Sequence, residues 1–265
     1  MQISKKPTHA AVSRFMETLL PLKENDVPRL YHVPRNTRYD SETAVVDQIV
    51  LSVTPTPGVY SFIGYTPDNA TLDPSVRPSP TRTRDPRTLC FLHRPFTLDR
   101  RSVRRGTLVL SSHNSFDEVL TTGWNPSLAA RLQINVDDSE EFGEAELAFD
   151  GLSDEIRAVA VMNAFNDHEV KRVLEVALQH GWAMANDEAP GKHILYLTGQ
   201  PRVNGMEAAK ALGMTVVCVG HRPAEDWGIR YMAAQLRTKF PTAMVHEVYE
   251  EEELRVKEPK ISEEG

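Results

Sequence analysis

The chain has 265 residues, which is enough for one large domain or two small ones with a buried core. Lysine and arginine number 30 against 37 aspartates and glutamates, so the formal net charge is −7, which argues against a general nucleic-acid or membrane-surface binder. The two cysteines do not suggest a disulfide framework, the N-terminus has no signal-peptide core, and no apolar run approaches the roughly 18 residues that span a bilayer. We therefore expect a cytoplasmic protein, with the nucleus as the alternative compartment.

Strands and helices alternate along the chain, which is typical of α/β proteins. Apolar runs rich in β-branched residues predict strands at 45–53, 88–93, 107–113, 155–162, 193–199, 214–219 and 243–248. Amphipathic patterns predict helices at 8–22, 58–65, 114–132 with an interruption near Gly123, 166–181, 204–213 and 223–239. In the helix at 166–181, Asn166 is the expected N-cap and Gly181 the residue that ends it.

These elements fall into two similar α/β halves, residues 1–136 and 150–250, which we expect to have mostly buried mixed sheets. The acidic stretch 137–146 between the halves is expected to be a solvated loop, and 251–265 a mobile acidic tail. The segment 66–87, rich in proline and arginine, predicts a mobile insertion, and a basic flap over a site is the alternative.

Three of the predicted strands end on a histidine: His93, His113 and His221. A carboxylate follows two of them after four residues, Asp117 after His113 and Glu225 after His221. Strand-to-helix junctions are where α/β sheets build sites, and an imidazole and a carboxylate one helical turn apart can converge on a divalent metal. Helix capping is the alternative, because a carboxylate in the first turn satisfies free amides. The repeated spacing favours a site for one or two ions.

Other segments give weaker indications of function. The basic run Asp99–Arg105 predicts a solvated helix face, with phosphate contact as the alternative. Ser111 and Ser112 stand beside a histidine but lack the G-x-S-x-G pattern of a serine nucleophile. Glycine-rich dinucleotide fingerprints are absent after every predicted strand.

Four motifs carry a resemblance to a known family: F-L-H-R-P-F, S-S-H-N-S-F-D, Y-L-T-G-Q and C-V-G-H-R-P-A-E-D-W-G-I-R. They resemble, in order, the H-H-P, A-H-T-N-L-D, T-G-E and G-H-x-x-T/S-E motifs of the NGG-one-interacting-factor-three family. This family is also known as type-2 GTP cyclohydrolase I or dinuclear-metal-centre proteins. The resemblance covers about Val45 to Glu251, and the ordered set is more specific than any single motif.

The resemblance implies a set of metal ligands in this chain. His93 matches the first histidine of H-H-P, Asp117 the aspartate of the second motif, and His221 and Glu225 the histidine and glutamate of the last. His113 matches the histidine of the second motif and would line the pocket. The implied cofactor is one or two divalent ions, and histidine with carboxylate suits zinc, iron, manganese, nickel or cobalt.

The chain also departs from the family pattern. Arg94 replaces the second histidine of H-H-P, Gln200 replaces the glutamate of T-G-E, and the family's N-terminal W-D-N-x-G segment has no counterpart. Arg94 removes a ligand and adds a permanent cation. Either a single metal binds tightly, or Arg94 swings out to hold an anionic substrate group, or the member has lost catalysis.

The function implied by the resemblance is a metal-dependent, cyclohydrolase-like hydrolase that attacks a C–N bond of a small heterocycle or amide with activated water. Glu225 or Asp117 would orient the water, His113 would transfer a proton, and Arg94 would position an anionic small-molecule substrate. The alternative is a non-catalytic metal-binding scaffold or transcription co-regulator. Family members commonly form toroidal hexamers of dimers, so we expect a homo-oligomer, and neither a membrane nor a nucleic-acid partner.

Overall fold

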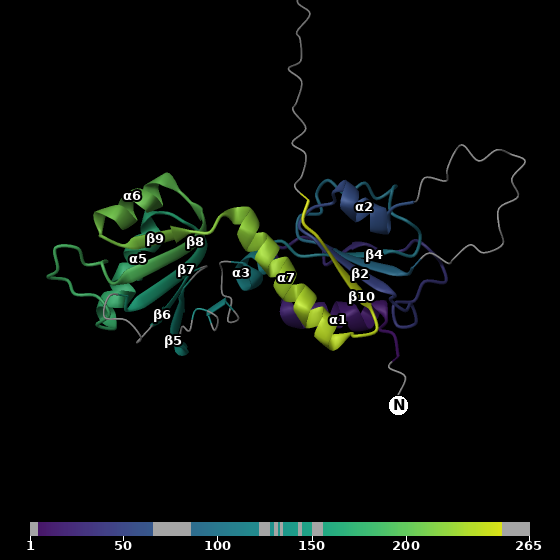
Figure 1. Cartoon of the computed structure of the whole chain (residues 1–265), viewed down its shortest axis with the longest axis horizontal. Coiled ribbons are helices and arrows are strands. Elements are labelled where there is room, and N and C mark those ends of the chain that lie inside the picture. Colours follow the sequence, from purple (N-terminus) through teal and green to yellow (C-terminus); the bar gives the residue numbers. More distant parts are fainter. Residues whose placement is uncertain are drawn as a thin grey trace, which may run out of the picture.

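The computed structural model describes residues 5–65, 86–121 and 156–250, and the shorter stretches 128–129, 132, 135–142 and 145–149. Nearly all of the predicted insertion 66–87, the predicted tail 251–265 and the interruption near Gly123 lie outside the described residues. Over the described residues the chain forms two five-stranded mixed sheets with helices packed on them (Figure 1), so the predicted α/β class is confirmed.

The first sheet has the strand order β1-β4-β3-β2-β10. Its strands are β1 (Leu30–His32), β2 (Gln48–Ser52), β3 (Thr88–Leu92), β4 (Leu108–Ser111) and β10 (Met244–Val248). β1 is antiparallel to β4, whereas the other neighbours are parallel. Every residue of β2, β3 and β4 is buried, as expected for parallel strands that are covered on both faces.

Helices cover both faces of the first sheet. On one face pack α1 (His9–Leu19), α3 (Asn114–Leu120) and α7 (His221–Lys239), which contribute Met16, Phe116 and Met232 to one continuous apolar core. On the other face lies α2 (Pro57–Ile63). α7 also contacts the second sheet, and Figure 1 shows its N-terminal end directed toward that sheet.

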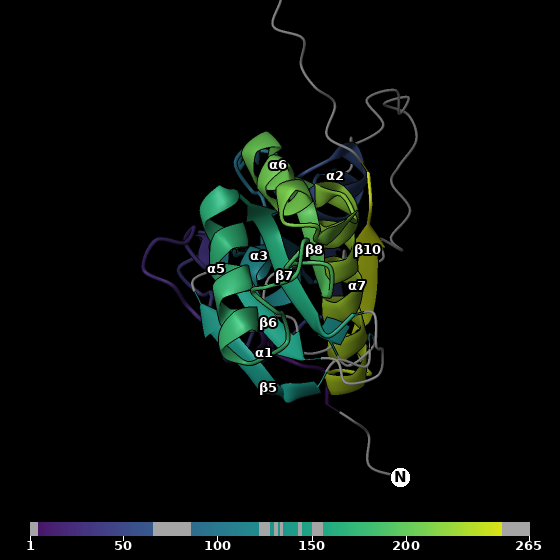
Figure 2. The ribbon, with the colours of Figure 1, turned by 90° about the vertical axis from the view of Figure 1, so that its left-hand side faces the viewer.

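The second sheet has the order β5-β6-β7-β8-β9. Its strands are β5 (Asn135–Phe142), β6 (Ala145–Phe149), β7 (Ala158–Phe165), β8 (Ile194–Pro201) and β9 (Thr215–Cys218). The helices α5 (Asp167–Gln179) and α6 (Val203–Ala211) cover the side of this sheet that faces away from the first (Figures 1 and 2). Asn166 and Glu169 form a complete capping box at the start of α5, and Gly181 adopts a φ of 73° after its end, as predicted.

Two features differ from the sequence-based expectation. The acidic stretch 137–146 was expected to be a solvated loop, which is wrong, because most of it forms β5 and the start of β6, paired antiparallel. Strand pairing overrides the low strand propensity of Asp and Glu there. The last helix and strand were grouped with residues 150–250, but β10 pairs with β2 in the first sheet. An apolar run predicts a strand without indicating which sheet the strand joins.

None of the helices in the described part of the chain is long and apolar enough to cross a lipid bilayer. The feature of the fold that matters most for function is the carboxyl end of β3 and β4. These two parallel neighbours both end beside the first turns of α3 and α7, which brings four elements to one point.

Candidate metal centre

His93 is the first residue after β3 and is fully buried. Its Nδ1 lies 3.1 Å from the carbonyl oxygen of Ser112, the residue that follows β4. Because a carbonyl oxygen only accepts hydrogen bonds, Nδ1 must carry the hydrogen in this contact, and Nε2 is left to face the opposite side of the ring. The ring also stacks on Phe116, with the centroids 4.4 Å apart. The imidazole is therefore held in one orientation from two sides.

Two carboxylates face the Nε2 atom of His93. Asp117 Oδ1, from α3, lies 3.4 Å away, and Glu225 Oε1, from α7, lies 3.2 Å away. The same Oε1 atom lies 3.2 Å from Nε2 of His221, which begins α7. The structure therefore brings together all four residues that the resemblance implied as metal ligands, from three elements widely separated in the sequence.

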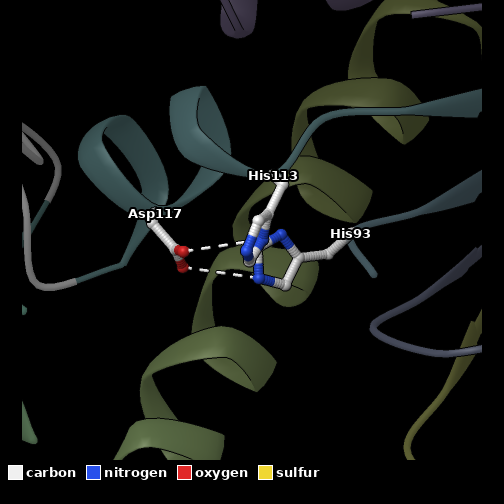
Figure 3. A group of neighbouring side chains, drawn as sticks. All are labelled: His93, His113 and Asp117. Atoms are coloured by element: carbon white, nitrogen blue, oxygen red, sulfur yellow. Dashed lines mark ion pairs between the residues drawn. The ribbon is translucent and has the colours of Figure 1, made fainter. Parts of the chain in front are cut away.

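His113 belongs to the same cluster. It precedes α3, and its Nδ1 lies 3.7 Å from Asp117 Oδ2. Figure 3 shows Asp117 facing both His113 and His93. The donor atoms of His93, His113 and Asp117 all lie within 4.8 Å of one another, so these three residues form a group able to hold a metal ion. The resemblance implied that His113 lines the pocket, and this geometry also makes it a candidate ligand.

The residues present fit a divalent ion. Several buried polar atoms at this point have no hydrogen-bond partner within the described structure: His93 Nε2, His113 Nδ1, Asp117 Oδ1 and Glu225 Oε1. Buried polar atoms are normally paired, so the convergence of four such atoms fits a bound cation. Ligands about 2.1 Å from a tetrahedral metal lie about 3.4 Å apart, which matches the observed separations of 3.4 and 3.2 Å around His93.

The electrostatics of the cluster are those of a cation site. Burial by itself lowers the pKa of His93, but close contact with Asp117 and Glu225 outweighs it and raises the pKa to about 9. Burial likewise raises the pKa of Glu225, yet contact with His221 and His93 lowers it to about 2. The two carboxylates thus favour a positive charge at their centre, and an incoming metal would have to displace the proton of His93.

Arg94 points into the same cluster. Its Nε lies 3.4 Å from Glu225 Oε1 and its Nη2 lies 3.4 Å from Glu225 Oε2, with one third of the side chain exposed. The guanidinium therefore already contacts one of the candidate metal ligands. Gln200, which replaces the family's third-motif glutamate, is an exposed residue of β8 in the second sheet.

Asp26 is a residue of the site that the sequence did not reveal. Its carboxylate accepts hydrogen bonds from the backbone amides of His113 (2.6 Å), Asn114 (3.0 Å) and Ser115 (3.2 Å), and from the hydroxyl of Ser112 (2.8 Å). Partial burial raises the pKa of Asp26, but these bonds hold it below its ordinary value. The aspartate lies in a polar connector with no periodic pattern, so only the folded chain shows its role.

Asp26 also decides between the two interpretations of Asp117. A carboxylate in the first turn of a helix often satisfies the free amides there. At α3 these amides are bound by Asp26 instead, so the Asp117 side chain is left to face His93 and His113. The alternative in which Asp117 acts as a helix cap is therefore not needed to explain its position.

The fold and the site define an α/β protein with a buried histidine–carboxylate group able to hold a divalent metal. The sequence profile described as Duf34/NIF3 (NGG1p interacting factor 3) matches residues 97–253, which is more than half of the chain. The protein therefore belongs to the NIF3 family, as the ordered motifs predicted.

Solved structures share the fold at low sequence identity. The protein ybgI, whose function is described as unknown, matches with a TM-score of 0.56 and 13% identity over 91% of this chain and 98% of its own. Reduced HcgD from Methanocaldococcus jannaschii matches with a TM-score of 0.56 and 14% identity, over 91% of this chain and 97% of its own. A Bacillus cereus protein related to NIF3 matches with a TM-score of 0.54 and 12% identity, over 97% of this chain and 99% of its own. A comparison with curated protein sequences gives no significant match.

Proposed function

We propose that this protein binds a divalent metal through His93, Asp117 and Glu225, with His113 or His221 as a further ligand, and hydrolyses a C–N bond of a small heterocycle or amide. The observation that supports the metal is the convergence of buried donor atoms that have no hydrogen-bond partner among the described residues. The reaction class rests on the family resemblance and on the position of the remaining polar side chains.

A divalent ion bound there would lower the pKa of a coordinated water from 15.7 toward about 7. Glu225 is fully buried and borders both His93 and His221, so it is placed to hold and orient the attacking water. His113 is 31% exposed in its side chain, so it borders both the cluster and solvent. That position suits a residue that takes up a proton and releases it to the surroundings.

Arg94 has the role of a substrate anchor in this proposal. It is partly exposed, its guanidinium lies at the edge of the cluster, and a guanidinium binds carboxylate or phosphate through two parallel hydrogen bonds. An anionic group on the substrate would compete with Glu225 for the guanidinium. The contact of Arg94 with Glu225 also places a fixed cation beside the metal centre, which favours occupancy by one ion rather than two.

The contact between Arg94 and Glu225 also supports a second candidate function. Because Arg94 already neutralises part of the charge on Glu225, a single ion closed off by protein ligands is also compatible with the cluster. In that case the protein would be a non-catalytic metal-binding scaffold or interaction module. A catalytic centre differs in keeping an open coordination position for water or substrate.

The test compares two variants of neighbouring residues on α7. Glu225→Gln removes the charge that faces the cluster, whereas the control Asp226→Asn changes a residue that pairs with Arg222 (2.8 Å) outside it. Metal-loaded proteins are assayed for amine or ammonia release from small cyclic amidines, lactams and formamides. We expect turnover in the wild type and the control, and a loss of about 100-fold or more in Glu225→Gln.

The same assay separates the two candidates. Stoichiometric metal binding without turnover on any member of the panel would favour the scaffold. Equal turnover by Glu225→Gln and the wild type would contradict the role of Glu225 in orienting water. Metal content is measured on the same samples, so that loss of the ion and loss of chemistry are distinguished.

A further inference from the structure

A large cavity lies at the other end of the first sheet from the metal centre. It has a volume of about 1520 Å³ and is lined by Thr88, the first residue of β3, and Thr107, which precedes β4. His93 and His113 follow the opposite ends of the same two strands. From Thr88 to His93 a strand rises about 16 Å, so the cavity and the metal centre are separate sites.

Part of the cavity lining, between Arg100 and Arg105, comes from the basic run Asp99–Arg105, which was expected to be a solvated helix face. That expectation is wrong, because the run forms turns, with Val103 bridged to Gly64 and the Ser102 hydroxyl bonded to Asp99. The turns bring four cationic side chains to the cavity: Arg100, Arg101, Arg104 and Arg105.

Three more arginines line the cavity: Arg35, Arg38 and Arg87. Of the described residues that line the cavity, Asp40 is the only carboxylate, and it already accepts hydrogen bonds from the Thr43 hydroxyl (3.1 Å) and the Glu42 amide (3.0 Å). The cavity is therefore strongly positive, although the whole chain carries a net charge of −7.

Two of the cavity arginines, Arg104 and Arg100, make contacts with uncharged groups. Arg104 Nη2 donates to the carbonyl oxygens of Phe62 (3.2 Å) and Pro86 (3.0 Å) and to the Thr88 hydroxyl (3.1 Å). The guanidinium of Arg100 lies over the ring of Tyr31, 4.4 Å from its centroid. The ring contact orders the guanidinium of Arg100 without neutralising it, which lowers the ordering cost of binding an anion.

His32 also lines the cavity and lies close to two of these arginines. Burial lowers the pKa of His32, and the charges of Arg100 and Arg35 lower it further. Both arginines are therefore close enough to His32 to act on one small region of the cavity. Arg87 differs, because its Nε and Nη2 atoms are held by Asp47 at 3.0 and 3.1 Å.

We propose that this cavity binds a small organic anion that carries two or more phosphate groups. Guanidinium groups match phosphate oxygens in geometry, and several arginines that line one cavity can engage more than one phosphate. The cavity exceeds the usual 300–1000 Å³ of a ligand pocket, and Tyr39 and Tyr65 line it beside the arginines, so an organic moiety has both space and aromatic surface. The acidic balance of the whole chain disfavours a long nucleic acid as the ligand.

The proposal is tested with inorganic tripolyphosphate as the probe, by isothermal titration calorimetry at about 150 mM salt, where weak surface attraction is screened. The test variant is Arg35→Gln/Arg100→Gln, which changes two exposed side chains that line the cavity from separate segments of the chain. The matched control is Arg202→Gln, an exposed arginine beside α6 in the second sheet. We expect saturable binding by the wild type and the control, and at least tenfold weaker binding by the double variant.

Two further arms define the ligand and the site. Orthophosphate should bind at least tenfold more weakly than tripolyphosphate, and Glu225→Gln should bind tripolyphosphate as the wild type does. The absence of saturable binding, equal binding by the double variant, or loss of binding in Glu225→Gln would overturn the proposal. So would tighter binding of a single-stranded 12-mer oligonucleotide that the double variant abolishes, because the cavity would then be a nucleic-acid site.

Discussion

Replacement of Asp26 by alanine should destabilise the protein and loosen the metal centre together. The carboxylate accepts four hydrogen bonds, at 2.6, 2.8, 3.0 and 3.2 Å, from the turn that joins β4 to α3. Loss of an N-cap costs about 0.5–2 kcal/mol, and hydrogen bonds to a charged group contribute about 1.5–3 kcal/mol each when fully desolvated. Because Asp26 is half-buried, water replaces part of the loss, and we expect a decrease of about 2–3 kcal/mol in the free energy of unfolding.

The assay is equilibrium urea unfolding followed by far-ultraviolet circular dichroism, with metal affinity measured by competition against a chelating dye. Asp26→Asn is the matched variant, because it keeps one acceptor oxygen and removes the charge. We expect its free energy of unfolding to decrease by about half as much as that of Asp26→Ala. Metal affinity should fall in Asp26→Ala, since His113 and Asp117 are positioned by the turn that Asp26 holds. Unchanged stability together with unchanged metal affinity would refute this account of the turn.

Two further perturbations test the packing and electrostatics of the first sheet. In Gly228→Ala the new Cβ would lie 2.7 Å from Phe116 Cζ and 2.8 Å from the Leu120 carbonyl oxygen. The cost of this overpacking should exceed the helix-propensity gain of about 1 kcal/mol, so we expect a lower melting temperature. A melting temperature at or above that of the wild type would show that α3 and α7 separate freely. Burial and the charge of Arg87 lower the pKa of His9 to about 4, so between pH 6.5 and 4 the unfolded chain binds a proton that the folded chain excludes. Stability should therefore fall by about 2–3 kcal/mol more in the wild type than in His9→Gln between pH 7 and 4.5, as measured by urea unfolding, and parallel pH profiles would contradict this assignment.

Much of the site was predictable because its residues stand at fixed offsets from strand ends. His93 and His113 follow two apolar runs, and parallel neighbours end at the same edge of a sheet, so their proximity follows from the sequence pattern. The four-residue spacing placed Asp117 and Glu225 one turn from a histidine. Whether Glu225 would meet His93 depends on how α7 packs on the first sheet, which no local pattern encodes.

Other features depend on contacts that only the folded chain creates. Asp26 lies 87 residues before the amide of His113 that it binds most closely, and its surroundings have no periodicity. β1 lies in the same polar connector and is recognised as a strand only through its pairing with β4. The cavity arginines come from three separate segments, of which one was singled out in the sequence as a basic run. Apart from the pairing of β10 with the first sheet, the division at 1–136 and 150–250 stays a prediction, as do the roles of the site residues and homo-oligomerisation.

The most direct test of the metal centre is the metal content of protein purified without a metal-affinity column, measured by inductively coupled plasma mass spectrometry. The variants are His93→Ala, Asp117→Asn and Arg94→His, with the exposed His168→Ala as the matched control. We predict about one ion per chain in the wild type and the control, near-complete loss in His93→Ala and Asp117→Asn, and a second ion in Arg94→His. A wild type that stays metal-free after incubation with zinc, iron, manganese, nickel and cobalt, or a His93→Ala variant that retains its ion, would contradict the account.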